Sequence, residues 1–293
     1  MDEGPIEGVV LDHVAHAVTR WQDVWTRYAV DLGAEWSSGG HGRGFAPAQL
    51  RFANGERIEV LMPNDPHLND FLQRFLEASG PGPHHLTFKV PDLTSALEKV
   101  RRSGIHPIGI DRSDPEWMEA FVHPRVATGV VVQLAEAYGT WSNPAPEDYP
   151  GGRRQRLDGT GPVPPAAFRR IVHAVADLER ASSLFVGLLG GGVIGRGNRS
   201  DHEWMEITWG GAPDLLLIAP LVGTSGTPLH RWIGSRGGRV HHLEFDVDEP
   251  ESIPGALPTS DRLVGLDIGH SRGRSWVVGS DINAGLQLVL HAP

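Results

Sequence analysis

The sequence predicts an α+β protein in which four β-α-β-β-β units form two domains. A strand pattern that begins with two histidines occurs at 84–90 and again at 241–247, 157 residues later. The segment His-Ala-Val at 16–18 recurs at 173–175 with the same spacing. A length of 293 residues suits two domains that each bury their own core. These observations together indicate a tandem duplication.

The first unit contains one helix and up to four strands. Apolar residues at helical spacing stop at Gly33, a residue type that often ends helices. A glycine-rich loop is expected at 39–44, and Asn54-Gly55 is typical of a hairpin turn. The expected elements are a strand at 9–18, a helix from Trp21 to Leu32, an edge strand near Glu35, and strands at 48–52 and 57–62.

The second unit repeats this order after a connecting helix. Pro91 and Asp92 suit the start of a helix that follows the double-histidine strand. The expected elements are the connecting helix from Asn69 to Ala78, the strand at 84–90, a helix from Leu93 to Arg102, and strands at 108–110, 119–123 and 130–134.

The domain boundaries follow from composition. Residues 138–166 are rich in proline and glycine and are predicted to be a linker. We therefore expect an N-terminal domain at 1–137 that carries the functional site, and a C-terminal domain at 167–293.

Composition narrows the classes of partner. The net charge of −10 argues against nucleic acid and anionic membranes, which leaves a small molecule as the expected partner. The chain has no cysteine, so thiolate metal sites and disulfides are excluded. It has no apolar stretch of the ~20 residues that a membrane span needs and does not begin with a signal peptide, so a cytoplasmic location is expected.

Strand alternation selects candidate polar residues. In the double-histidine strand, Leu86 and Phe88 share an apolar face, and His85 points to the other side. Glu59 and Gln133 likewise fall opposite the apolar faces of their strands. Glu136, a carboxylate three residues further on, is an alternative to Gln133 only if a β-bulge changes its direction.

Four short motifs, in order and spacing, resemble those of the vicinal oxygen chelate superfamily. This superfamily includes glyoxalase I, methylmalonyl-CoA epimerase, extradiol dioxygenases and bleomycin-resistance proteins. The motifs are Asp12-His13-Val14-Ala15, Ile58-Glu59-Val60, His84-His85-Leu86, and His123-Pro124 followed by Gly129-Val130-Val131-Val132-Gln133-Leu134.

The resemblance implies tandem glyoxalase-like domains in which paired units curl into two cups. It implies one divalent metal ion, held by His13, Glu59, His85 and Gln133 in the N-terminal cup. Imidazole, carboxylate and amide ligands suit Zn²⁺, Mn²⁺, Fe²⁺, Co²⁺ or Ni²⁺, and do not choose among them. The C-terminal cup is expected to be a degenerate copy, because the matching positions hold Arg170, Leu216, His242 and Val289.

The first functional hypothesis is an isomerase or lyase that acts on a substrate chelated through neighbouring oxygens. Glu59 would transfer the proton after leaving the metal, as the matching glyoxalase carboxylate is thought to do. Arg51 and Arg57 are candidates to hold a substrate carboxylate or phosphate. Gln49 stands where epimerases carry a catalytic glutamate; it cannot act as a base and is predicted to bind substrate instead.

Two other classes remain open. Two histidines and a carboxylate also satisfy the facial triad of an Fe²⁺-dependent ring-cleaving dioxygenase. A non-catalytic ligand-binding or resistance protein is the third hypothesis. We further expect a pseudo-dimer within one chain, with a homodimer possible. Two further pairs of histidines match across the repeat and are predicted to be structural, His16 with His173 and His84 with His241.

Overall fold

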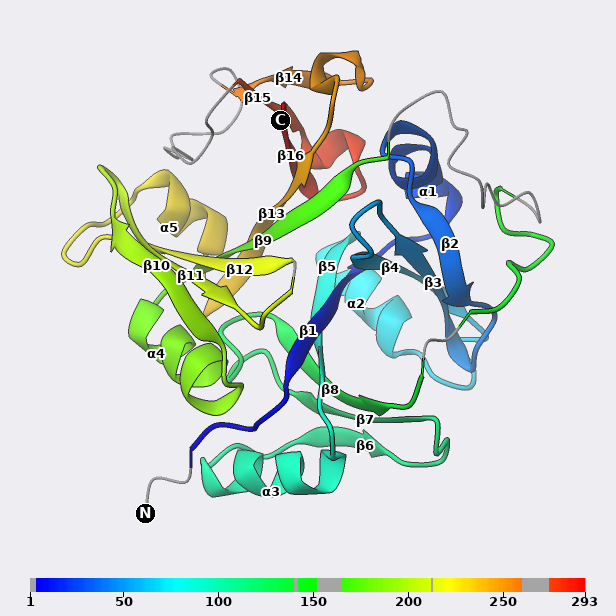
Figure 1. Ribbon diagram of the computed structural model, residues 1–293, viewed down its shortest axis with the longest axis horizontal. Helices are drawn as coiled ribbons and strands as arrows, with labels where there is room; N and C mark the ends of the chain where they lie inside the picture. Colours follow the sequence, from blue (N-terminus) through cyan, green and yellow to red (C-terminus); the bar gives the residue numbers. More distant parts are fainter. Residues whose placement is uncertain (1–3, 140–141, 152–164, 212, 260–273, 293) are drawn as a thin grey trace.

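The computed structural model describes residues 4–139, 142–151, 165–211, 213–259 and 274–292. The described chain forms two eight-stranded sheets with few helices (Figure 1). The sheet orders are β2-β3-β4-β1-β5-β8-β7-β6 and β10-β11-β12-β9-β13-β16-β15-β14. The second order reproduces the first strand for strand, which confirms the predicted α+β duplication.

The N-terminal sheet contains every strand and helix that the sequence predicted for it. The helix expected from Trp21 to Leu32 is present, but its second half is a π-helix. The elements are β1 (Val10–Ala17), α1 (Gln22–Trp25), the π-helix η1 (Thr26–Asp31), β2 (Glu35–Gly39), β3 (Gly44–Arg51), β4 (Arg57–Asn64), α2 (Phe71–Ser79), β5 (Gly82–Lys89), α3 (Leu93–Arg102), β6 (Ile108–Asp111), β7 (Trp117–Val122) and β8 (Val131–Ala137).

The strand predicted at 48–52 begins four residues earlier than expected. It starts at Gly44 because β4 continues to Asn64 and supplies a backbone partner along the whole length of β3. The loop predicted at 39–44 is correspondingly shorter.

The C-terminal sheet repeats the strands of the first, with a short 3-10 helix at the place of α3. The elements are β9 (Ala167–Val175), α4 (Leu178–Ser182), the π-helix η2 (Ser183–Leu188), β10 (Gly192–Asn198), β11 (His202–Thr208), β12 (Asp214–Pro220), α5 (Pro228–Ile233), β13 (Gly238–Asp246), the 3-10 helix η3 (Pro250–Ser252), β14 (Ala256–Pro258), β15 (Ser275–Val278), the 3-10 helix η5 (Ser280–Ile282) and β16 (Gln287–His291).

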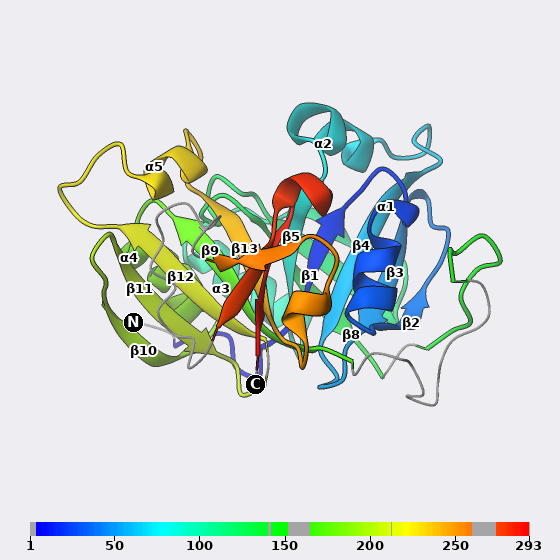
Figure 2. The ribbon, with the colours of Figure 1, turned by 90° about the horizontal axis from the view of Figure 1, so that it is seen from above.

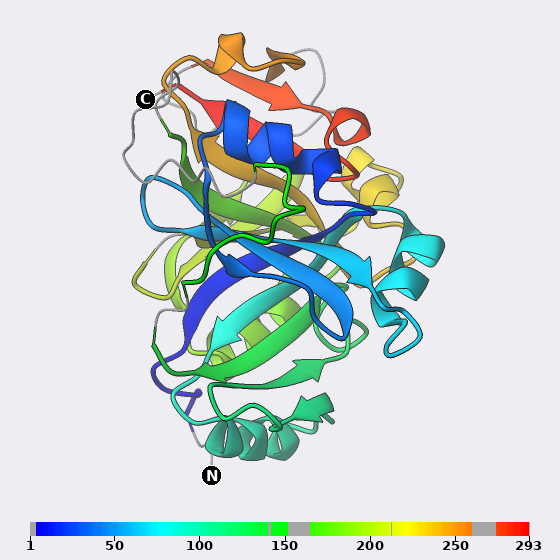
Figure 3. The same ribbon diagram turned by 90° about the vertical axis from the view of Figure 1, so that its right-hand side faces the viewer.

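The two sheets share one continuous hydrophobic core. Phe168 stacks on Phe245 with ring centroids 4.9 Å apart, and Phe52 of the other sheet lies 5.0 Å from Phe245. The turn predicted at Asn54 also joins the halves, since its side-chain amide exchanges two hydrogen bonds with the backbone of Phe168. Figures 1 and 3 show α1 lying beside the C-terminal strands, where Arg27 donates to the Pro254 carbonyl at 2.8 Å.

Two glycines allow the halves to approach closely. Gly129 and Gly285 both have positive φ, at 91° and 81°. A β-carbon at Gly129 would collide with the backbone of Gly238, and one at Gly285 would collide with the Pro81 carbonyl. The second half therefore contacts the first through equivalent, closely packed backbone segments.

The predicted linker at 138–166 lies partly outside the described residues. Its part at 142–151 packs on the N-terminal sheet. Tyr149 is buried against Trp21 and Trp36, with ring centroids 5.6 and 4.7 Å away. Asn143 pairs with the backbone of Gly39 through both amide atoms. This segment thus extends the edge of the N-terminal domain.

Two helices lie on the same side of the molecule, α2 over the N-terminal sheet and α5 over the C-terminal sheet (Figure 2). Leu72 of α2 packs on Ala15, Ala17 and Leu61, the apolar upper part of the first cup. No helix among the described residues has both the length and the apolar character needed to cross a membrane.

Candidate metal centre

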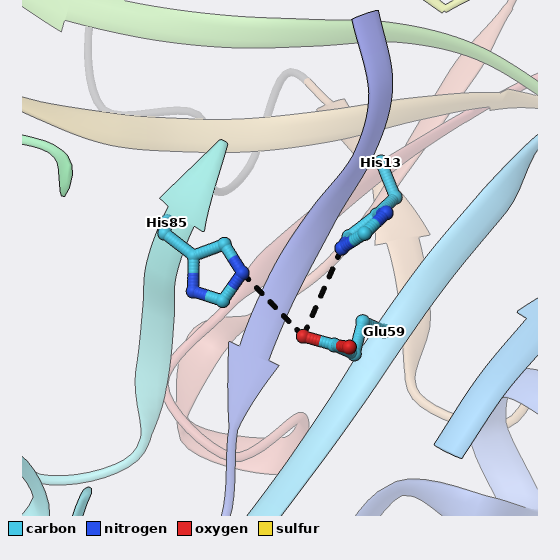
Figure 4. A group of neighbouring side chains, drawn as sticks. All are labelled: His13, Glu59 and His85. Carbon is cyan, nitrogen blue, oxygen red and sulfur yellow. Dashed lines mark ion pairs between the residues drawn. The ribbon is translucent and has the colours of Figure 1, made fainter. Parts of the chain in front are cut away.

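Three buried side chains converge in the N-terminal cup (Figure 4). Nε2 of His85 lies 3.4 Å from Oε2 of Glu59, and Nε2 of His13 lies 3.8 Å from the same oxygen. One ligand atom from each residue lies within 4.8 Å of the others. Side-chain exposures of 0%, 11% and 6% for His13, Glu59 and His85 place the group out of bulk water.

The strand order explains why these residues meet. The four central strands are β4-β1-β5-β8, and each contributes one of the predicted ligand residues. Glu59 pairs with Ala15, two residues after His13, and Gln133 pairs with Thr87, two residues after His85. Because side chains alternate along a strand, this register directs all of them to the concave side.

Asp12 orients His13 by binding the ring nitrogen that faces away from Glu59. Its Oδ2 lies 2.8 Å from Nδ1 of His13, and Lys89 and Arg57 lie 2.9 and 3.6 Å from its Oδ1. A carboxylate that holds the second nitrogen of an imidazole is a common support for metal ligands. Although burial alone would lower it, the hydrogen bonds and charges of Asp12 and Glu59 raise the pKa of His13 to about 9.

His84 supports His85 in the same way. Nδ1 of His84 lies 2.8 Å from Nδ1 of His85, and Phe71 and Phe75 pack against the His84 ring. Burial, together with the neighbouring His85, lowers the pKa of His84 to about 3, so this ring stays neutral. When Nδ1 of His85 donates to Nδ1 of His84, Nε2 of His85 presents a lone pair to the cup.

Glu59 is held by Gln49. The Gln49 amide donates to Oε1 of Glu59 at 2.8 Å, and Oε2 faces the two histidines. Although burial opposes it, His13 and His85 hold the pKa of Glu59 well below its usual range, so the carboxylate is ionised. Oε1 of Gln49 is buried and has no hydrogen-bond partner among the described residues.

The fourth predicted ligand, Gln133, belongs to a chain of hydrogen bonds. The Thr87 hydroxyl lies 2.9 Å from Nε2 of His13 and donates to Oε1 of Gln133 at 2.5 Å. Nε2 of Gln133 donates to Oε2 of Glu119 at 2.6 Å, and the Trp117 indole donates to the same oxygen at 2.8 Å. The amide oxygen of Gln133 therefore faces the cluster through Thr87.

Glu136, the alternative to Gln133, points to the other face of β8. Its carboxylate accepts from the backbone N–H of Leu93 at 2.7 Å and from the Tyr138 hydroxyl. There it binds the first turn of α3. No bulge turns it towards the cluster.

The two predicted substrate-binding arginines lie at different places. Arg57 contacts Asp12, the residue that binds Nδ1 of His13, and so supports His13 indirectly. Arg51 is exposed and lines a cavity of about 260 Å³ with Glu35, Phe52 and Pro165, near the domain junction.

Sequence reasoning missed Asp12, Thr87 and Glu119 as parts of this centre. Thr87 and Glu119 lie on the cup side of their strands, and alternation alone identifies that side. Asp12 directly precedes His13 in a motif that the resemblance already included. The sequence therefore indicated the direction or place of each of the three residues. Which residues they contact depends on the strand register, which the sequence does not give.

The C-terminal cup contains a different polar group. Arg170, at the position that corresponds to His13, has Nε 3.3 Å from Oε2 of Glu244. His242 and His291 lie 3.2 and 3.3 Å from the two oxygens of Glu244. Leu216 and Val289, at two further ligand positions, are buried in apolar contacts. A permanent guanidinium cation thus stands where the first cup presents a histidine.

The residues of the N-terminal cup fit a divalent metal ion. Nε2 of His85 is buried and has no hydrogen-bond partner within the described part of the chain. Two imidazoles and an ionised carboxylate at this spacing form a donor set that Zn²⁺, Mn²⁺ or Fe²⁺ accepts.

Comparison with known proteins gives the family. Residues 11–189, more than half of the chain, match the sequence model of the glyoxalase-like domain. The chain belongs to the glyoxalase-like family. The resemblance to the vicinal oxygen chelate superfamily is thereby confirmed. Among curated proteins the comparison found no match.

Solved structures show how far this glyoxalase-like fold extends. A mutant of 4-hydroxymandelate synthase from Streptomyces coelicolor superposes with a TM-score of 0.66 at 13% identity, covering 99% of this chain and 93% of its own. Methylmalonyl-CoA epimerase from Mycobacterium tuberculosis has a TM-score of 0.41 at 25% identity and covers 47% of this chain and 93% of its own. A hypothetical protein from Bacillus halodurans has a TM-score of 0.42 at 26% identity, covering 47% and 100%. The first match confirms the fold over both halves.

Proposed function

We propose that this glyoxalase-like protein is a metal-dependent enzyme of the isomerase or lyase type, with one metal ion in the N-terminal cup. The observation that carries the proposal is the buried group of His13, Glu59 and His85, with its ligand atoms within 4.8 Å of one another. A divalent ion bound there supplies Lewis-acid stabilisation to a substrate that chelates it through neighbouring oxygens.

The chain's own residues would bind and orient the substrate. Oε1 of Gln49 is buried and lacks a hydrogen-bond partner among the described residues, so it is suited to accept from a substrate O–H or N–H. This supports the prediction that Gln49 binds substrate. Ala15, Leu61, Phe45 and Phe71 form an apolar cluster under α2, which would exclude water from one side of the cup.

Glu59 is the candidate for proton transfer. Its Oε2 faces the cup, and Gln49 holds its Oε1. With Oε1 held by Gln49, Oε2 would leave the metal ion and accept the substrate proton. Arg51 lines the cavity near the domain junction, so it would contact only a substrate that extends to that edge.

An Fe²⁺-dependent oxygenase is the second candidate. His13, Glu59 and His85 satisfy the two-histidine, one-carboxylate requirement of such enzymes. The fold similarity to 4-hydroxymandelate synthase covers both domains and fits this class as well as the first. Dioxygen consumption separates the two candidates.

Elemental analysis tests the proposal. Purified protein, reconstituted with Zn²⁺, Mn²⁺ or Fe²⁺ and freed of excess ion, should hold one ion per chain. His85→Ala should lose it, since two remaining strong ligands rarely retain these ions. His67→Ala, at an exposed histidine of the same domain, is the matched control and should bind normally. Unchanged metal content in His85→Ala, or a wild type that binds none of the three ions, would refute the proposal and favour a binding protein.

A further inference from the structure

Two strand pairs of the N-terminal cup carry the same hydrogen-bonded pair of residues in opposite order. On β3 and β4, the amide of Gln49 donates to the carboxylate of Glu59 at 2.8 Å. On β7 and β8, the amide of Gln133 donates to the carboxylate of Glu119 at 2.6 Å. Each pair has one carboxylate and one amide. The inner residue, which is the predicted metal ligand, is the carboxylate Glu59 in the first pair and the amide Gln133 in the second.

An amide at the inner position must have a particular orientation to bind a metal ion, whereas a carboxylate need not. A carboxylate offers an oxygen to a metal ion in either orientation, but an amide offers oxygen on one side and an N–H₂ group on the other. A glutamine in the flipped orientation would direct its hydrogens at the ion. Gln133 therefore ligates only if something selects the orientation with Oε1 inward.

Glu119 has the properties needed for that selection. Its Oε2 accepts the hydrogen bond from Nε2 of Gln133 at 2.6 Å, so it pairs with the N–H₂ side of the amide. The Trp117 indole donates to the same oxygen, Oε2, at 2.8 Å and fixes Glu119 in place. On the other side of the amide, the Thr87 hydroxyl donates to Oε1 of Gln133, and this hydrogen bond favours the same orientation.

We infer that Glu119 is a positioning residue that fixes the Gln133 amide with its oxygen directed at the metal centre. This inference rests on the proposed metal site and adds to it the means by which a neutral ligand is oriented. Supporting residues of this kind typically change metal affinity 10–100-fold when removed.

A double-mutant cycle tests the inference. Affinity for Zn²⁺ is measured by competition with a chromophoric chelator for wild type, Glu119→Ala, Gln133→Ala and the double variant. We expect Glu119→Ala to weaken binding roughly tenfold, at the lower end of the usual range for supporting residues. In the Gln133→Ala background, removing Glu119 should have no further effect, because its target is gone. Glu116→Ala, exposed on the same segment, is the matched control and should bind as wild type does.

The exchange of both residues gives a second measurement. Glu119→Gln with Gln133→Glu recreates the order found in Gln49 and Glu59, so it should bind Zn²⁺ at least as tightly as wild type. Gln133→Glu alone faces Glu119 with a second carboxylate and should bind more weakly than the exchanged pair. Thermal unfolding of the metal-free variants verifies that each is folded.

The outcomes separate this inference from the proposed function. Additive effects of Glu119→Ala and Gln133→Ala, or an unaffected affinity in Gln133→Ala, would overturn the inference and leave the three-residue site intact. A wild type that binds no Zn²⁺, Mn²⁺ or Fe²⁺ would overturn both.

Discussion

Nε2 of His16 lies 2.8 Å from the carbonyl oxygen of Ala284, which joins the first strand of one domain to a turn of the other. Nδ1 of His16 lies 2.9 Å from the Tyr28 hydroxyl, so both ring nitrogens are occupied. The C-terminal copy repeats the contact in reverse, with Nε2 of His173 3.0 Å from the carbonyl oxygen of Thr128. Both carbonyls belong to residues with positive φ. The two buried histidines thus fasten the domains to each other, in agreement with the structural role predicted for them.

Removal of the His16 ring should destabilise the whole chain. His16→Leu leaves the Ala284 carbonyl and the Tyr28 hydroxyl buried without this partner, and each such loss costs about 1–3 kcal/mol. We expect the free energy of unfolding to fall by about 2–4 kcal/mol in urea titrations. His41→Ala, at a partly exposed ring, should change it by less than about 0.5 kcal/mol. Equal effects of the two substitutions would contradict this role.

The stability of the metal-free protein should fall as the pH drops below 6.5. Burial, opposed by the hydrogen bonds to backbone carbonyls, lowers the pKa of His16 and His173 from 6.5 to about 4. Between these values the unfolded chain binds more protons than the folded chain, so stability rises with pH in this window. Urea midpoints measured from pH 4.5 to 7 should show this slope. His16→Gln should reduce it, and an unchanged slope in that variant would refute the assignment.

Metal binding should release a proton from His13. In the metal-free protein the pKa of His13 is raised to about 9, so at pH 7.5 the ring carries a proton on each nitrogen. A metal ion requires the lone pair of Nε2, and its apparent affinity should therefore rise about tenfold per pH unit up to this pKa. Calorimetry at pH 7.5 in buffers of different ionisation enthalpy should show close to one proton released per ion. In Asp12→Asn the release should decrease, because the carboxylate that raises the pKa is gone.

The proposed pseudo-dimer predicts a monomeric chain. The halves already bury a common core that includes Phe52, Phe168 and Phe245. Sedimentation velocity should accordingly give a mass near 31.8 kDa. A mass about twice this value would mean that the duplication does not replace association between chains.

The sequence predicted the architecture and, with the family resemblance, the three residues that converge in the N-terminal cup. Alternation places Glu59 and His85 opposite the apolar faces of their strands, whereas His13 was selected through the family resemblance. The repeat at 157 residues implies paired sheets. Alternation does not reveal which side chains meet across strands. The contact of Glu119 with Gln133 depends on the pairing of β7 with β8, and on the reach of both side chains.

The contacts between the domains could not be predicted from the sequence either, because they depend on how the two sheets dock. The Asn54 turn was predicted from local chemistry, but its bonds to Phe168 depend on how two complete sheets dock. The same is true of His16 and Ala284, which are separated by 268 residues. Local patterns locate such residues without identifying their partners.

Arg170 gives the C-terminal cup a built-in positive charge at the position where the N-terminal cup has His13. Its guanidinium is part of the chain and lies 3.3 Å from the carboxylate of the buried Glu244, which it supplies with a counter-charge. The C-terminal cup therefore needs no metal ion to balance the charge of Glu244. In the proposed metal-dependent enzyme, only the N-terminal half would depend on an exchangeable ion. Removal of that ion by a chelator should accordingly leave the buried Arg170–Glu244 pair of the C-terminal cup intact.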